Sequence, residues 1–121
     1  MNVFRAGQHP GWPARLGPVI VAGGQVTLRP VRFRDAAAWS RIRLRDRDHL
    51  ERWEPTGRGS WEARNHASNW PSLWTSLKAE ARRGAMIPLV IEVDGQFSGQ
   101  LTICNIVRGA LRSAWIGYWV A

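Results

Sequence analysis

The spacing of apolar residues in this sequence changes near residue 86. Beyond it, apolar side chains occupy alternate positions, at Ile87, Leu89, Ile91 and Val93. Asp94-Gly95 follows, a dipeptide typical of tight hairpin turns, and a second alternating set comes after it at Phe97, Gly99, Leu101 and Ile103. A period of two places each set on one face of a strand. The pattern therefore predicts an antiparallel hairpin over residues 87–103.

The last stretch of the sequence, "RSAWIGYWVA", has the same period and predicts a third strand after a turn near Gly109. One face carries Ala114, Ile116, Tyr118 and Val120, and the other carries Trp115 and Trp119. Because both faces are apolar, we expect this strand to be covered on both sides, as a central strand is.

The residues before this meander have a helical period. Apolar side chains recur at helical spacing over residues 61–83, where Pro71 predicts a kink or restart with Asn69 as a second cap. Asp35 is expected to cap a shorter helix, "AAAWSRIRLRD". "VIVAGGQVTLRPV" predicts two short strands joined at Gly23-Gly24. These elements indicate an α+β domain over residues 19–121, after an irregular lead-in at 1–18.

The chain is strongly basic, with 17 Lys and Arg against 9 Asp and Glu and a formal net charge of +8. Nearly all of this charge is arginine, a bias that a GC-rich gene also produces. Basic charge favours acidic partners, such as phosphate-bearing cofactors, RNA or ribosomes. The one cysteine, Cys104, excludes an intrachain disulfide and a zinc cluster, and a reducing cytoplasm fits best. "LGPVIVAGG" is short and broken by Pro18, so it predicts neither a signal peptide nor a membrane span.

Residue patterns alone do not identify a catalytic centre. His9, His49 and His66 lie far apart in the sequence, and each is interpreted as a surface residue. There is no Gly-rich phosphate loop of the Walker or dinucleotide type, and no metal site is expected. The chain has 8 tryptophans, which among basic residues could stack on nucleic-acid bases. Trp70 and Trp74, however, fall on the apolar stripe of the predicted 61–83 helix, which favours core packing.

The order of elements and a set of motifs together resemble the GNAT superfamily of N-acetyltransferases. The motifs are "VTLRPVRFRDAAAW", "RDRDHLERWEP" and "DGQFSGQLTICNI", the last followed by "RSAWIGYWVA". More narrowly, residues 19–121 are similar to the ribosomal-protein-alanine N-acetyltransferase branch. The resemblance implies part of a GNAT fold, with a mostly antiparallel sheet. It also implies that acetyl-CoA donates an acetyl group to an amine, above all the N-terminal α-amine of a ribosomal or other protein.

The resemblance also implies a cofactor strand. Backbone groups of Trp119, Val120 and Ala121 are the expected contacts for the pantetheine arm of acetyl-CoA, which pairs with the strand as a missing neighbour would. Backbone donors from Gly117 to Trp119 are expected to polarise the thioester carbonyl.

The expected acceptor side comes from two other places in the chain. Trp53 and Glu54 in "LERWEP" match a loop that lines the acceptor, where Glu54 would bind or deprotonate the amine. An ordinary solvated acid is the alternative for Glu54. The resemblance also implies that Trp115 and Tyr118 of the last strand, with Trp53, contact the substrate. Many relatives have a glutamate at the position of Trp115, so a general base on this strand is in doubt.

The family's phosphate-binding loop, which leads into a helix N-terminus, is expected just beyond Ala121. The resemblance therefore predicts that the 121 residues are the N-terminal half of the fold, truncated and lacking half of a cofactor site. Two other functions stay open: a basic, Trp-rich module that binds RNA or the ribosome without catalysis, and an acetyltransferase for a small-molecule amine. The sequence does not indicate an oligomeric state.

Overall fold

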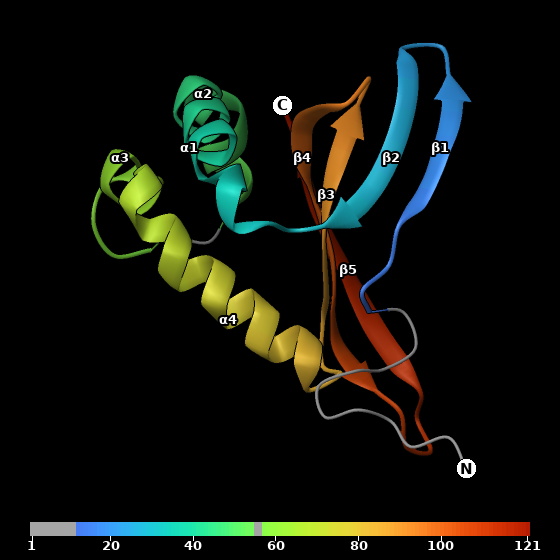
Figure 1. Ribbon diagram of the computed structural model, residues 1–121. Coiled ribbons are helices and arrows are strands. Elements are labelled where there is room, and N and C mark those ends of the chain that lie inside the picture. The colour runs from blue at the N-terminus through green and yellow to red at the C-terminus, as the bar shows by residue number, and fades with distance from the viewer. Residues whose placement is uncertain (1–11, 55–56) are drawn as a thin grey trace.

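An antiparallel sheet forms one layer of the structure, a computed structural model that describes residues 12–54 and 57–121. Its strands follow one another in chain order, β1-β2-β3-β4-β5 (Figure 1). The strands are β1 (Leu16–Val21), β2 (Gly24–Pro30), β3 (Ile87–Val93), β4 (Gln96–Val107) and β5 (Ser113–Val120). The predicted meander over β3, β4 and β5 is confirmed, as is the α+β class.

The β3–β4 hairpin has the predicted turn. Asp94 and Gly95 both have positive φ angles, 51° and 80°, as a tight hairpin turn requires. Leu89 pairs with Leu101, but the register shifts where Ile91 faces Gly99. The next pair is Glu92 with Phe97, so Ser98 is an extra residue on β4. An extra residue of this kind is a β-bulge, and it bends the strand.

Short helices connect β2 to β3. The α-helices are α1 (Ala36–Arg45), α2 (Arg47–Leu50), α3 (Trp61–Arg64) and α4 (Trp70–Arg82), and the 3-10 helices span Phe33–Asp35, Glu51–Trp53 and Ala67–Asn69. The predicted 61–83 helix is thus divided. Pro71 lies in the first turn of α4, where a missing N–H costs nothing, so the helix restarts there. Among the residues that the structure describes, no helix is long and apolar enough to cross a membrane.

The first strands differ in detail from the prediction. β1 begins at Leu16, before the expected domain start at residue 19. The turn is at Ala22-Gly23, and Gly24 already belongs to β2. Residues 1–11 of the predicted lead-in lie outside the described residues.

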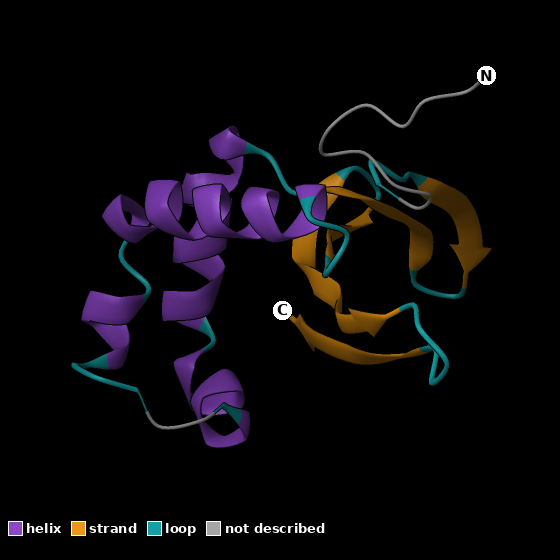
Figure 2. Ribbon diagram, turned by 90° about the horizontal axis from the view of Figure 1, so that it is seen from below, coloured by secondary structure: helices purple, strands orange, loops and turns teal. Residues whose placement is uncertain are grey.

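The helices gather on one side of the sheet, and two perpendicular views agree on this arrangement (Figures 1 and 2). The core between the two layers contains the buried side chains of Val31, Trp39, Trp70 and Val90. The rings of Trp39 and Trp70 pack with their centroids 5.2 Å apart. Burial of such large side chains supplies most of the hydrophobic stabilisation in a domain this small.

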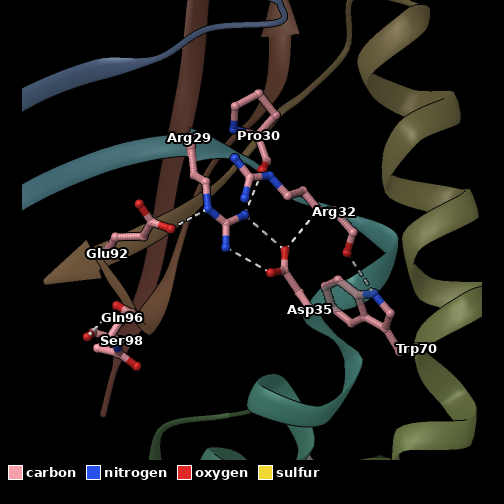
Figure 3. Close-up of polar contacts among 8 residues, drawn as sticks. All are labelled: Arg29, Pro30, Arg32, Asp35, Trp70, Glu92, Gln96 and Ser98. Atoms are coloured by element: carbon pink, nitrogen blue, oxygen red, sulfur yellow. Dashed lines mark hydrogen bonds and ion pairs between the residues drawn. The ribbon is translucent and has the colours of Figure 1, made fainter. Parts of the chain in front are cut away.

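A buried ion network joins the sheet to the first helices (Figure 3). Arg29 on β2 donates to Asp35 at 2.8 and 3.1 Å and to Glu92 on β3 at 2.6 Å. Burial by itself lowers the pKa of Arg29, but the hydrogen bonds and charges of the two carboxylates outweigh it and raise that pKa. Asp35 precedes α1 as predicted, yet its carboxylate binds Arg29 and the Arg32 N–H and makes no capping bond to α1.

The prediction that β5 is covered on both faces is wrong for the described residues. Within these residues β5 pairs with β4 alone, so it is an edge strand. Trp115, Ile116 and Tyr118 are 69%, 67% and 71% exposed. Trp119, in contrast, is half-buried and packs against the core.

Candidate functional site

A cavity of about 650 Å³ opens between the helical layer and the strands β4 and β5. Its lining comes from α2 and the segment after it, from one face of α4, from the middle of β4 and from the C-terminal half of β5. The residues are His49, Leu50, Trp53, Glu54, Leu73, Leu77, Gln100, Thr102, Gly117, Tyr118, Trp119 and Val120. A mostly apolar cavity with a few convergent polar groups is typical of small-molecule and cofactor sites.

One wall of the cavity is formed by β5. The indole N–H of Trp119 donates to the Gln100 side chain on β4 at 3.0 Å, and the Trp119 ring lies 5.9 Å from the Phe97 ring. Gln100 is buried, so this bond satisfies a polar group that would otherwise be costly to bury. Together these contacts fix the orientation of the indole at the cavity wall.

The backbone of β5 has one open edge. The Ala121 N–H donates to the Ser98 carbonyl on β4 at 2.9 Å. Peptide groups alternate in direction along a strand, so those of Tyr118 and Val120 point away from β4. Within the described residues no strand pairs with that edge. An open strand edge of this kind is a template for any extended chain that carries amides.

Glu54 contributes a carboxylate to the cavity. It follows the 3-10 helix Glu51–Trp53, and its side chain is 29% exposed. Both of its oxygens accept hydrogen bonds from Nη2 of the buried Arg43, at 2.5 and 2.7 Å. The carboxylate therefore has a fixed place at the cavity and is held there by a cation from α1.

The structure brings most of the predicted site residues together. Trp53, Glu54, Tyr118, Trp119 and Val120 all line the cavity, although Trp53 is 78% exposed. Their assigned roles stay predictions.

The remaining predicted residues lie elsewhere. Trp115 is not among the lining residues, because it is four positions back along β5 from Trp119. Ala121 is next to the lining residue Val120, and its N–H is already used in pairing with β4.

The sequence pattern did not identify several lining residues. Gln100 is a polar residue within the alternation of β4, and a buried polar position on a strand is the signal that could have marked it. Leu73 and Leu77 fall on the apolar stripe of α4 and are indistinguishable there from core residues. His49 is exposed, as predicted, but lines the cavity as well.

The other histidines do not contribute to this site. His66 is exposed and its Nδ1 lies 2.8 Å from the Ser68 hydroxyl, whereas His9 lies outside the described residues. In residues 12–54 and 57–121, no group of three or more His, Cys, Asp or Glu side chains could hold a metal ion.

Solved structures of acetyltransferases match this fold. The chain is 62% identical to RimJ from Mycobacterium smegmatis, solved in complex with CoA-disulfide, with a TM-score of 0.91 over 94% of this chain and 55% of that one. The ribosomal-protein-S5-alanine acetyltransferase from Vibrio fischeri matches at 20% identity and a TM-score of 0.66, over 78% and 51%. The acetyltransferase MccE, in complex with acetyl-CoA and AMP, matches at 16% identity and 0.65, over 84% and 56%.

The chain thus spans about half the length of these structures. No protein-family model matches the chain, and no curated protein sequence matches it.

Proposed function

Because the chain belongs to the GNAT superfamily of N-acetyltransferases, in the ribosomal-protein branch, we propose that it acetylates the N-terminal α-amine of a ribosomal protein. The observation that carries this proposal is the 62% identity to RimJ, a structure that holds CoA, over 94% of this chain. Ribosomal proteins are cytoplasmic in bacteria, and we place the activity there.

The open edge of β5 is the proposed cofactor strand. Acetyl-CoA supplies an acetyl group activated as a thioester, and its pantetheine arm contains amides. The peptide groups of Tyr118 and Val120 point away from β4 and are free to pair with such amides. The backbone N–H of Tyr118, between Gly117 and Trp119, points away from β4 at the cavity wall, where it would stabilise negative charge developing on the thioester oxygen.

The acceptor amine is proposed to enter from the side of Trp53 and Glu54. The amine nitrogen bonds to the acetyl carbonyl carbon, the carbon–sulfur bond breaks, the amine loses a proton and the leaving thiolate gains one. A protein α-amine titrates at about pH 7.7–8.0, so part of it is already neutral near pH 7. Glu54, with both oxygens on Arg43, therefore serves best by binding the incoming ammonium group before it loses its proton.

The apolar lining of the cavity supports an uncharged first residue of the acceptor. Leu50, Leu73 and Leu77 supply apolar walls, which favour a methyl side chain such as that of alanine over a charged one. The name of the Vibrio fischeri enzyme, ribosomal-protein-S5-alanine acetyltransferase, also gives alanine as the residue modified by that protein.

Acetyl transfer can be tested in a chimera in which residues 1–121 replace the aligned segment of Mycobacterium smegmatis RimJ. We expect mass spectrometry to find one acetyl group added to the α-amine of a peptide beginning with alanine. A peptide with a blocked N-terminus and an internal lysine is the control and should stay unmodified. Modification of the lysine peptide alone, or of neither peptide while RimJ itself is active, would contradict the proposal.

A further inference from the structure

Arg43 on α1 is a buried cation that joins several elements around the cavity without lining it. The residue is 6% exposed. Its Nε donates to the side-chain oxygen of Asn65 at 2.5 Å, and its Nη2 donates to both oxygens of Glu54. Its guanidinium carbon lies 4.9 Å from the ring centroid of Trp61 and 4.9 Å from that of Trp119.

The surroundings hold this guanidinium in one place. The Trp61 indole N–H donates to the Arg43 carbonyl at 2.8 Å, and the Asn65 amide donates to the Trp61 carbonyl at 2.9 Å. Each partner of Arg43 on the α3 side is therefore itself fixed by a hydrogen bond. A planar guanidinium that is both stacked and hydrogen-bonded has little conformational freedom. An ammonium group on a flexible stem would retain more of it.

Glu54 depends on this cation for its position. Both of its carboxylate oxygens are bonded to Arg43. Trp119, whose ring also contacts the guanidinium, belongs to the proposed cofactor strand. The same side chain thus contacts the acceptor-side carboxylate and the indole of β5.

We propose that Arg43 is a positioning residue that sets the place of the Glu54 carboxylate relative to β5, and so determines acceptor binding. This inference rests on the proposed function. Arg43 is expected to affect binding of the acceptor and not binding of acetyl-CoA. The reason is that pairing with β4 fixes the backbone of β5 independently of Arg43.

The test compares variants of the RimJ chimera. Arg43→Lys keeps the positive charge but loses the stacked, planar donor. We expect its KM for the alanine peptide to rise about tenfold, the effect of losing a charge-assisted hydrogen bond. The Kd for acetyl-CoA, measured by calorimetry, should stay within about twofold, a change that corresponds to less than one weak hydrogen bond.

A matched control separates positioning from general stability. Ser40 is buried on the same helix and donates from its hydroxyl to the Asn65 carbonyl at 2.6 Å. Ser40→Ala removes a contact between α1 and α3 but leaves the Arg43–Glu54 pair in place. It should lower the thermal midpoint without raising the KM for the peptide. An equal rise in KM for Ser40→Ala and Arg43→Lys would overturn the proposal.

A second comparison holds even where Arg43→Lys is poorly stable. If Arg43 acts through Glu54, the Glu54→Gln variant and the Arg43→Lys/Glu54→Gln double variant should have the same KM for the peptide. If the rise in KM of the double variant were instead the product of the rises in the two single variants, the proposal would be contradicted. An inactive unsubstituted chimera would refute the proposed function instead, so the two failures are distinguishable.

Discussion

Arginine side chains occupy interior positions in this fold that hydrophobic alternation assigns to the outside. Thr27 and Arg29 are buried on β2, on the opposite face from Val26 and Leu28, which are half-buried. Burial of a guanidinium is tolerated only when carboxylates accept its hydrogen bonds. Arg29 meets this condition through the nearby Asp35 and through Glu92, which is distant in the sequence, and so the alternation along β2 does not reveal it.

Loss of one carboxylate from this network should lower the stability of the fold. Asp35→Ala leaves Arg29 buried with one anion in place of two and also removes the acceptor of the Arg32 N–H. We expect the free energy of unfolding, from urea denaturation, to fall by about 3 kcal/mol. Asp48→Ala, at an exposed aspartate, should change it by less than about 0.5 kcal/mol. Similar values for the two variants would show that the buried network adds no stability.

At the scale of elements, the pairing of β4 with β5 depends on Gly99. Its φ angle is +155°, and an added Cβ would lie 2.2 Å from the Trp119 carbonyl oxygen and 3.0 Å from the Val120 Cα. The glycine therefore allows the bulged part of β4 to approach the proposed cofactor strand closely. A side chain at this position would push β5 away from β4.

Gly99→Ala should lower the free energy of unfolding by about 1–3 kcal/mol, because both backbone strain and the clash act on β5. It should also weaken acetyl-CoA binding by the RimJ chimera, measured by calorimetry. Gly109→Ala is the matched control, since an added Cβ there meets nothing within 4 Å. If Gly99→Ala bound acetyl-CoA with unchanged affinity, cofactor binding would not depend on the close pairing of β5 with β4.

Local patterns predicted some elements well and others poorly. The alternation from Ile87 to Ile103 and the Asp94-Gly95 turn were sufficient for β3 and β4, because period and turn chemistry agree there. Apolar spacing predicted the residues of α3 and α4 as one helical stretch, and Pro71 predicted a kink or restart within it. The restart is confirmed, because α4 begins after Asn69, although the Asn69 side chain makes no capping bond. The exposure of Trp115 was not predictable, because burial depends on neighbouring segments rather than on the strand's own composition.

At the scale of the molecule, the helical layer and the sheet each contribute residues to the site. Glu54 comes from the helical segment and Trp119 from the last strand, and the fold brings both to one cavity through Arg43. The family motifs predicted Glu54 and Trp119 as site residues. They did not predict Arg43 or Gln100, whose roles depend on contacts between segments distant in sequence.

We propose that β5 offers its open edge to acetyl-CoA, and residue-resolved amide hydrogen exchange in the RimJ chimera can detect this pairing. The amides of Tyr118 and Val120 point away from β4, whereas that of Ala121 is already bonded to Ser98. Saturating acetyl-CoA should therefore slow exchange at Tyr118 and Val120 and leave Leu89, in the interior of the sheet, unchanged. Unchanged exchange at Tyr118 and Val120 when acetyl-CoA is bound would contradict this account.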